Sequence, residues 1–209
     1  MMSAPIILQA TDLSFCYPER ALFQQLSLKL GAGLAIIRGG DGRGKTSLIR
    51  LLAGALQADS GQLAINGIRL DQEAARYRQQ VYYVDPRTEE FDQMTVLHYL
   101  ASVQAQFAGF DQALVPLLLE GLSLTPHVEK KLFMLSTGSK RKVYLAAAFA
   151  AGALVNLLDD PFAGLDHGSI NFVCATLNEL NARAQQIWVA SFYETPAELT
   201  ATTNIDLGD

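Results

Sequence analysis

One stretch, Leu34–Ile49, limits the folds open to this chain more than any other part of it. It runs from a short apolar segment through a glycine-rich turn into a segment that opens with Lys45-Thr46. Gly39, Gly44 and the Lys-Thr pair follow the spacing G-x-x-x-x-G-K-[ST], in which backbone N–H groups converge on phosphate. The lysine adds a positive charge for the outer phosphates, and the threonine hydroxyl suits a magnesium ion. The stretch therefore predicts a strand, a phosphate-binding loop and a helix of an α/β protein.

A glycine-rich turn can precede Lys-Thr by coincidence in any α/β protein, so the context of the loop matters. The apolar, β-branched strand Leu34–Arg38 comes directly before it. The segment Thr46–Ala55 after it carries Leu48, Leu51 and Leu52 at helical spacing. We therefore expect a nucleotide site formed by Gly39, Gly40, Asp41, Gly42, Arg43, Gly44, Lys45, Thr46 and Ser47.

Length and charge narrow the class of protein. The chain has 209 residues, half of them hydrophobic, which suits one α/β domain or a large domain with an inserted lobe. Its formal net charge is -5, so the broad positive surface of a nucleic-acid-binding protein is absent and we expect no nucleic-acid partner. The first nine residues lack the regions of a secretion signal, and the run Val143–Leu158 is too short and interrupted to span a bilayer. We therefore expect a cytoplasmic protein.

Hydrophobic patterns predict alternating strands and helices along the chain. Asn66-Gly67 gives a strong hairpin signal, and Thr95 is placed to cap a helix. An antiparallel β start is expected from the first two of the predicted strands, which are Ile6–Ala10, Leu26–Leu30, Leu34–Arg38, Gln62–Ile65, Val81–Val84, Leu154–Leu158, Gln186–Ala190 and Asn204–Leu207. Beyond the phosphate loop and the helix after Thr95, the predicted helices are Leu114–Leu124, Lys140–Ala151 and Ile170–Ala184.

Several chemically active side chains have ordinary interpretations. Cys16 and Cys174 lie far apart without metal-ligand spacing, so we expect them to be buried or half-buried residues of a reduced compartment. His98, His127 and His167 are scattered, so we expect surface or capping roles.

Tyr17 lies between the first two predicted strands, two residues after another aromatic residue, Phe15. An aromatic ring next to a nucleotide site stacks on a purine in some proteins. Phe15 and Tyr17 are equally suited to packing at the edge of the sheet, and the pattern leaves both alternatives open.

Four stretches fall in an order that resembles the ATP-binding subunit of ATP-binding cassette (ABC) transporters over nearly the whole chain. The phosphate loop Gly39–Thr46 comes first, and Leu135–Ser139 is similar to the signature loop of that family. Leu157–Pro161 is similar to its second Walker motif, and Phe162–Asp166 to the loop that crosses between two subunits.

The resemblance implies an α/β fold: a P-loop NTPase core with a mainly parallel sheet, an N-terminal antiparallel β lobe and an inserted helical subdomain. It implies a single ABC-type ATP-binding domain over residues 1–209, with the helical subdomain inserted at about 87–140. It also implies that Leu34–Arg38 and Leu154–Leu158 are neighbouring strands of the central sheet.

The same resemblance assigns binding roles, with ATP and Mg²⁺ as the cofactors. Tyr17 occupies the position of the adenine-stacking aromatic. Lys45 and the backbone of Gly40–Thr46 are implied to hold the β and γ phosphates, and Thr46 and Asp159 to hold the magnesium ion.

In the family, two such domains close head to tail around two ATP molecules. Ser136 and Gly138 are then implied to meet the γ-phosphate held by the phosphate loop of a second ATP-binding domain, in a homodimer or a heterodimer. The catalytic residues implied within one chain are Lys45 and Asp160.

Three departures from the family pattern touch catalysis rather than binding. After Val81–Val84, Pro86 stands where the family has a glutamine that contacts magnesium and the attacking water. Asp160 replaces the usual glutamate and is one methylene shorter, and Phe192 stands where a histidine contacts the γ-phosphate. A misplacement of about 1 Å can cost on the order of 100-fold in rate. We therefore expect an ATPase that is slow, or alternatively a non-hydrolysing partner in an asymmetric pair.

The expected function is that of the energy-coupling subunit of an ABC transporter, which drives conformational change in a membrane-spanning partner subunit. Such a chain is attached peripherally, through its partner, to the cytoplasmic face of the inner or plasma membrane. The run from Lys45 to Gly54 and the compact length are similar to small exporter subunits such as those of the haem exporter used in cytochrome c maturation. A kinase or GTPase built on the same loop would need an acceptor site or a guanine-reading element, and we find neither.

Overall fold

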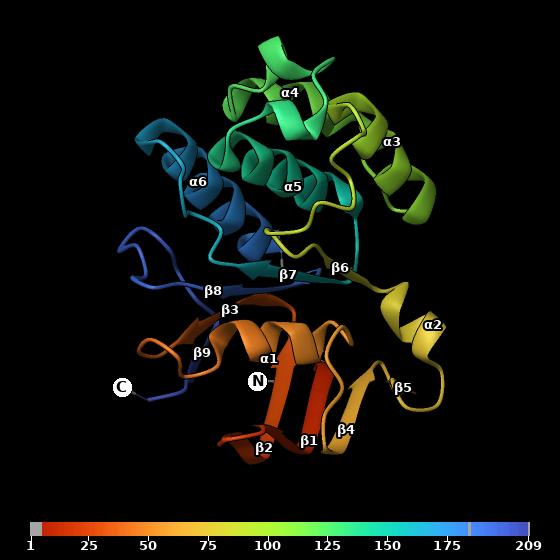
Figure 1. The fold of residues 1–209 in the computed structure, drawn as a ribbon, viewed down its shortest axis with the longest axis vertical. Coiled ribbons are helices and arrows are strands. Elements are labelled where there is room, and N and C mark those ends of the chain that lie inside the picture. Colours follow the sequence, from red (N-terminus) through yellow and green to blue (C-terminus); the bar gives the residue numbers. More distant parts are fainter. Residues whose placement is uncertain (1–5, 184, 209) are drawn as a thin grey trace.

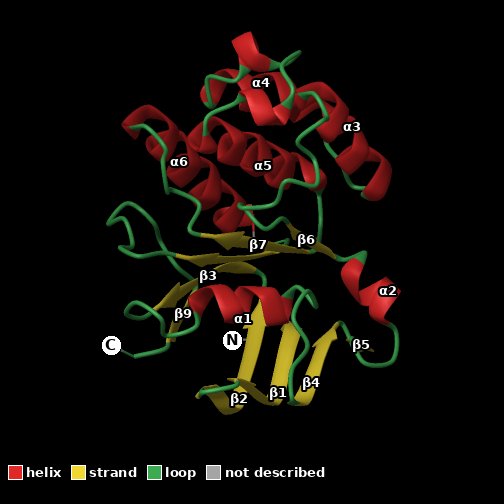
Figure 2. Ribbon diagram, in the orientation of Figure 1, coloured by secondary structure: helices red, strands yellow, loops and turns green. Residues whose placement is uncertain are grey.

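The computed structural model describes residues 6–183 and 185–208. Its elements form an antiparallel β lobe, a parallel sheet and a layer of helices, stacked along the longest axis of the molecule (Figures 1 and 2). The helix that follows the phosphate loop, α1 (Lys45–Leu52), lies between the β lobe and the parallel sheet. The fold class predicted from the sequence is confirmed.

The antiparallel lobe comes from the N-terminal third of the chain. Its strands are ordered β2-β1-β4-β5, and every neighbouring pair is antiparallel. Asn66 and Gly67 both have positive φ angles, of 48° and 82°, and close the hairpin that the sequence predicted. The first two strands are longer than expected; the bounds are β1 (Ile6–Tyr17), β2 (Arg20–Gly31), β4 (Ser60–Ile65) and β5 (Ile68–Arg69).

The parallel sheet has the strand order β6-β7-β8-β3-β9. The implied pairing of Leu34–Arg38 with Leu154–Leu158 is therefore wrong, because β8 lies between these strands and pairs with both. All five residues of β8 are buried, as expected for the central strand of a parallel sheet that is covered on both faces. The strand expected from Val81–Val84 is at the edge of the sheet. The bounds are β3 (Gly33–Arg38), β6 (Val81–Tyr83), β7 (Val155–Asp159), β8 (Ile187–Ser191) and β9 (Thr203–Asp206).

The helical layer covers the face of the parallel sheet that points away from the β lobe (Figure 1). Thr95 caps α3 as predicted, since its hydroxyl accepts a hydrogen bond from the His98 N–H at 3.1 Å. The fourth helix ends at Gly121, earlier than expected, and the fifth begins at Thr137, earlier than expected. The bounds in this layer are α3 (Val96–Gln106), α4 (Val115–Gly121), α5 (Thr137–Ala151) and α6 (His167–Arg183), with 3-10 turns at Gln112–Leu114, Thr125–His127 and Leu132–Met134. Helix α2 (Ala74–Arg78) lies apart from this layer, beside β5 and β6. The last residue of the predicted helix Ile170–Ala184 lies outside the described residues.

Two hydrophobic cores lie on opposite faces of the parallel sheet. Along β3, Leu34 and Ile36 belong to the core under the helices, whereas Ala35 and Ile37 belong to the core shared with α1 and the β lobe. This division follows from the alternation of side chains along a strand. A strand buried on both faces needs apolar residues at every position, which explains the continuous apolar runs in the sequence.

Helix α5 is the most enclosed helix of this layer. Eleven of its fifteen residues are buried, because it lies against α3, α4 and the β6 edge of the sheet. The apolar run Val143–Leu158 is divided between this helix and β7. Within the described ranges, no helix combines the length and the apolar character needed to cross a membrane.

Helix α5 ends at Gly152, whose φ of 66° is left-handed. A Cβ at this position would lie well inside contact distance of the Gly109 carbonyl. We expect Gly152→Ala to lower the free energy of unfolding by roughly 2–4 kcal/mol, since backbone strain and the clash add. Gly67→Ala is the matched control, because its φ is 82° but a Cβ there would meet nothing within 4 Å. Urea unfolding of both variants measures the difference; we expect about 1 kcal/mol for Gly67→Ala, and equal losses would show that the Gly109 contact has no cost.

Candidate functional site

The predicted phosphate loop connects the carboxyl end of β3 to the first turn of α1. Gly42 and Gly44 adopt left-handed φ angles of 71° and 95°, which side chains rarely allow. A Cβ on Gly44 would also lie 3.0 Å from the ring of Phe23 in β2. Glycine is therefore required here both by the backbone path and by the approach of the β lobe. The unpaired N–H groups at the start of α1 face the same loop, as an anion site requires.

Lys45 is held over this loop by the backbone. Its Nζ donates hydrogen bonds to the carbonyl oxygens of Gly39 at 2.6 Å and Gly40 at 3.0 Å. The loop is tied in turn to the C-terminal strand region, since the Gly40 N–H donates to the Gly208 carbonyl at 3.0 Å. These contacts place one positive charge at the mouth of a backbone anion site.

The carboxyl ends of β7, β8 and β3 meet beside Lys45. Asp159 and Ser191 are register partners at the ends of β7 and β8. The hydroxyls of Thr46 and Ser191 both donate to Asp159 Oδ1, at 3.1 and 2.8 Å. Ligands of open α/β sheets bind at this edge. Thr46 and Asp159, predicted as the magnesium pair, are thus in direct contact.

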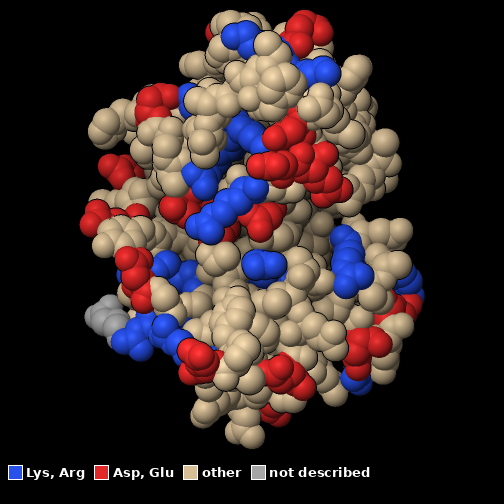
Figure 3. Space-filling model, viewed as in Figure 1, with Lys and Arg blue, Asp and Glu red and all other residues tan. Residues whose placement is uncertain are grey.

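A cavity of about 530 Å³ opens at this edge, between the β lobe and the helical layer. Figure 3 shows basic side chains gathered around the middle of the same face of the molecule. The residues predicted for nucleotide binding that line the cavity are Tyr17, Asp41, Gly42, Arg43, Gly44, Lys45, Thr46, Ser47, Asp159 and Asp160. Gly39 and Gly40 contribute through the carbonyls that hold Lys45.

The sequence interpretation missed several lining residues. They are Arg20, Leu22, Arg87, Arg141, Ser191 and Tyr193. They come from separate elements, and motif spacing does not show that they converge. Ser191 alone had a sequence signal, because a polar residue at the end of a buried strand stands out from the apolar residues before it.

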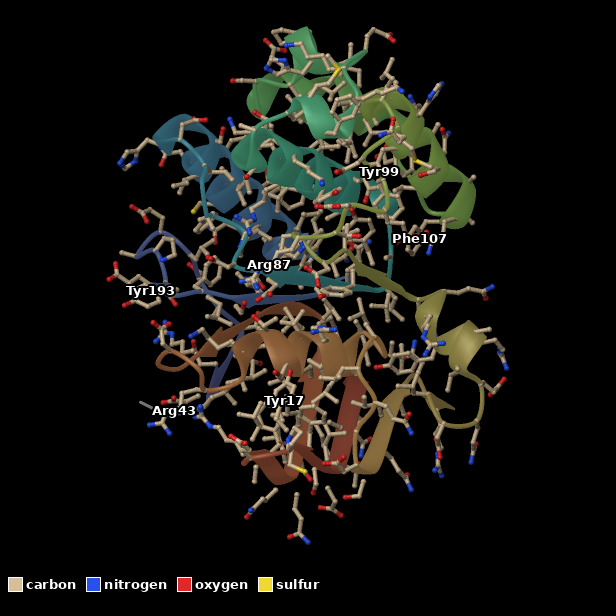
Figure 4. The ribbon with its side chains drawn as sticks, in the orientation of Figure 1. Tyr17, Arg43, Arg87, Tyr99, Phe107 and Tyr193 are labelled. Carbon is tan, nitrogen blue, oxygen red and sulfur yellow. The ribbon has the colours of Figure 1, made fainter. Side chains whose placement is uncertain are left out.

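Tyr17 packs within the β lobe and also borders the cavity, while its stacking on a purine stays a prediction. Its ring packs edge-on against Phe15, with centroids 5.0 Å apart. It also lines the cavity, is 43% exposed, and its hydroxyl shares a hydrogen bond of 3.2 Å with the Ser47 hydroxyl. Figure 4 shows it on the lobe side of the molecule, apart from Arg87 and Tyr193. The exposed part of the ring is free for a planar ligand.

Asp160 follows the strand end and lies in a strained conformation. Its φ is 46°, in the left-handed region that aspartate tolerates better than most residues. Its N–H donates to Ser191, to the hydroxyl at 3.1 Å and to the carbonyl at 3.2 Å. Burial raises the pKa of its carboxyl; the positive charges of Arg141 and Lys45 oppose this, and the charge of Asp159 adds to it. A carboxyl with a raised pKa in a cleft suits proton transfer.

Pro86 and Phe192 both line the cavity, near Asp159 and Asp160. The Phe192 ring is 2% exposed and packs against Phe162 with centroids 5.0 Å apart. Neither residue offers a side-chain hydrogen-bond donor. This wall of the cavity is therefore apolar at the two positions where the resemblance implied a glutamine and a histidine.

Ser136 and Gly138 lie outside this cavity, at the start of α5. The Ser136 hydroxyl caps the helix by accepting from the Ser139 N–H at 3.1 Å, and Ser136 is exposed. Gly138 is buried against the Gly164 carbonyl, where a Cβ would clash. Glycine is therefore required at position 138 by a contact within this chain. Contact of either residue with a second subunit remains a prediction.

The cysteines and histidines differ in part from expectation. The expected burial of Cys16 is wrong: it is exposed, because it lies at the outer end of β1, where its N–H donates to Asp59. Cys174 is buried as expected. His98 and His167 lie at the surface, His127 is half-buried, and among the described residues no three His, Cys, Asp or Glu side chains form a metal-binding group.

The sequence was compared with known families. A profile described as ABC transporter matches residues 23–163, which is more than half of the chain. The chain belongs to the ABC transporter family. Within this family, proteins named cytochrome c biogenesis ATP-binding export protein CcmA are similar to it. The protein of Pseudomonas syringae pv. syringae is 33% identical, with 81% of this chain and 80% of that protein covered. That of Rhodospirillum rubrum is 34% identical, with 86% and 76% covered.

Solved structures agree with the ABC assignment. A structure described as the ATP-binding subunit of an ABC transporter is 25% identical with a TM-score of 0.78, covering 89% of this chain and 79% of that chain. A protein of Pyrococcus furiosus described as a putative ABC transporter ATP-binding protein has a TM-score of 0.74 at 23% identity, covering 96% of each chain, and supports the fold. The chain is thus an ATP-binding subunit of an ABC transporter, as predicted.

We expect Ser191→Ala to weaken Mg²⁺ binding in the presence of an ATP analogue by about 10–100-fold, because Asp159 loses a donor that orients its carboxylate. Titration of Mg²⁺ against a fluorescent ATP analogue measures this. Ser102→Ala is the control, since the Ser102 hydroxyl donates to the Tyr99 carbonyl within α3. Unchanged Mg²⁺ affinity in Ser191→Ala would remove the orienting role.

Proposed function

We propose that this subunit binds ATP with Mg²⁺ in the cavity and hydrolyses it slowly. The single observation behind this proposal is the contrast between two sides of one cavity. The phosphate loop is complete, with Lys45 held by two carbonyls and Thr46 in contact with Asp159. Opposite them, Pro86 and Phe192 present no donor, and Asp160 carries the only carboxylate beyond Asp159 on that wall, among the described lining residues.

The residues fit a magnesium ion by the chemistry of their donors. Mg²⁺ prefers oxygen ligands and is held by few protein groups together with substrate phosphates. The hydroxyl of Thr46 and the carboxylate of Asp159 provide two such oxygens at the foot of the phosphate loop. When bound, the ion would neutralise part of the negative charge of the phosphates. Lys45 neutralises the outer phosphates, and Tyr17 and Ser47 also line the cavity.

The chemical step assigned to this chain is the activation of water by Asp160. Its carboxylate has to be ionised to accept the proton of the attacking water, and burial raises its pKa. Hydrolysis should therefore fall as the pH is lowered through that raised pKa. The short side chain keeps the charge but reduces the reach, which makes turnover slow.

The transport role requires partners. We propose that two ATP-binding domains, identical or different, close so that Ser136 of each faces the phosphate loop of the other. The exposed helix cap at Ser136 leaves that surface accessible. A membrane-spanning subunit would hold the pair at the cytoplasmic face of the membrane, and the similarity to proteins named ATP-binding export proteins supports such a transport role. Residues 1–209 are proposed to be one ATP-binding domain, with the helical subdomain at about 87–140.

ATP turnover by the purified chain at saturating Mg²⁺ tests this function. We expect measurable hydrolysis that Lys45→Ala abolishes through loss of phosphate binding, and that Asp160→Asn reduces by at least about 100-fold without loss of analogue binding. Asp111→Asn is the matched control, because Asp111 caps a 3-10 turn in the helical layer by accepting from the Ala113 N–H. Hydrolysis that survives in Lys45→Ala would point to a contaminating ATPase.

The lack of side-chain donors at Pro86 and Phe192 also favours a second candidate, a subunit that binds ATP without hydrolysing it. In that case the nucleotide stabilises the dimer with a partner that carries the catalytic site. Tight analogue binding with no turnover would select this alternative.

Restoring the family residues separates the two cases. We expect Asp160→Glu, Phe192→His and Pro86→Gln together to raise the turnover by about 10–100-fold, since each returns a group that acts on water or the γ-phosphate. Steady-state turnover, with thermal unfolding of the same variant as a folding check, provides the measurement. Unchanged or lower turnover in the folded triple variant would show that these positions do not limit the chemistry.

A further inference from the structure

Arg141 reaches the cavity from the second turn of α5. One of its terminal nitrogens, Nη1, donates a hydrogen bond to the Ala163 carbonyl, in the loop after β7. The side chain lines the large cavity together with Asp159 and Asp160. It also lines a smaller cavity of about 30 Å³ behind it. Among the described residues, only Pro86, Arg141 and Asp159 line both cavities. Arg141 therefore lies where the two cavities adjoin.

The guanidinium group is fixed on one side and free on the other. Nη1 is committed to Ala163, and Nε is buried without a hydrogen-bond partner among the described residues. Nη2 likewise has no partner in the described chain, but it is not among the buried atoms. No carboxylate oxygen forms an ion pair with Arg141 within 4.0 Å in the described ranges. Its Nη2 edge is therefore available to a ligand, and its charge, which also acts on Asp160, is not paired within 4.0 Å in the described ranges.

Among the described cations that line the cavity, only Lys45 and Arg141 are held by a side-chain hydrogen bond within the chain. Pro86 and Phe192 have no side-chain donor, and the Ser191 hydroxyl is committed to Asp159. Arg87, labelled in Figure 4, lines the same cavity but is exposed, and its side chain makes no hydrogen bond to the described residues. Arg141 is thus a second fixed cation, besides Lys45, in the cavity that Asp159 and Asp160 line. A planar guanidinium suits phosphate oxygens better than a lysine does.

We propose that Arg141 donates from its Nη2 edge to the terminal phosphate of ATP bound by the same chain, and so supplies the contact that Pro86 and Phe192 cannot make. The proposal rests on the proposed ATP site. Arg141 distinguishes ATP from ADP, because only ATP carries the phosphate within its reach. It also stabilises the charge that develops on that phosphate during hydrolysis.

Nucleotide titrations of the full-length chain test this assignment. We expect Arg141→Gln to weaken binding of a non-hydrolysable ATP analogue by about 10-fold or more and binding of ADP by less than about 2-fold. Arg141→Lys keeps the charge and should recover part of the loss. In single-turnover assays with saturating ATP, we expect the hydrolysis rate of Arg141→Gln to fall by about 10–100-fold.

Two further variants make the result decisive. Arg183→Gln carries the same substitution at an exposed end of α6, in an ion pair with Glu179, and should change neither titration. Arg87→Gln tests the other arginine of the cavity. Equal weakening of analogue and ADP in Arg141→Gln would assign it a structural role and overturn the proposal, as would loss of discrimination in Arg87→Gln alone. If the unaltered chain binds neither nucleotide, the proposed function itself fails.

Discussion

The carboxylate of Asp159 is the contact on which the rest of the site depends. It accepts hydrogen bonds from Thr46 at the start of α1 and from Ser191 at the end of β8. Three segments far apart in the sequence are thereby fixed at one sheet edge. This is possible only because β8 lies between β7 and β3, which aligns the carboxyl ends of all three strands. The strands themselves are buried and apolar, so the polar groups that can bind a ligand are those at the carboxyl ends of the strands.

Much of the fold follows from local signals. The phosphate loop, the Asn66-Gly67 hairpin and the Thr95 cap each depend on a few neighbouring residues, and all three are where the sequence predicts them. The order of the strands in the sheet, in contrast, does not follow from local signals. Whether β8 or β7 lies beside β3 depends on pairing between distant segments, and all three strands are equally apolar, so the pattern cannot distinguish them. The exposure of Cys16 was missed for a similar reason, because it depends on which face of β1 the partner strands cover.

The site shows the same division. Motif spacing places Lys45, Thr46, Asp159 and Asp160 in one cavity, because each stands at a fixed offset from a strand end. Arg141 could not be placed in this way. It is one of three consecutive basic residues in a helix, and sequence alone gives no reason for one of them to reach the cavity while its neighbours turn elsewhere. The signal becomes visible only when Ala163, Pro86 and Asp159 are seen around the same side chain.

Those three basic residues connect helix α5 to the loops around the nucleotide site. Lys140 bonds Asp92 and the Thr88 carbonyl in the loop after β6, Arg141 bonds Ala163 after β7, and Lys142 bonds Asp166 at 2.5 Å, just before α6. One turn of α5 thus holds three separate segments, and the low pKa of the Asp166 carboxyl reflects the Lys142 contact above all. Because α5 is enclosed by α3 and α4, it cannot shift without moving them. If ATP binds Arg141 as proposed, it contacts the helix that carries Ser136 at its exposed end, and this helix would then connect the nucleotide site of one chain to the surface proposed to face the next.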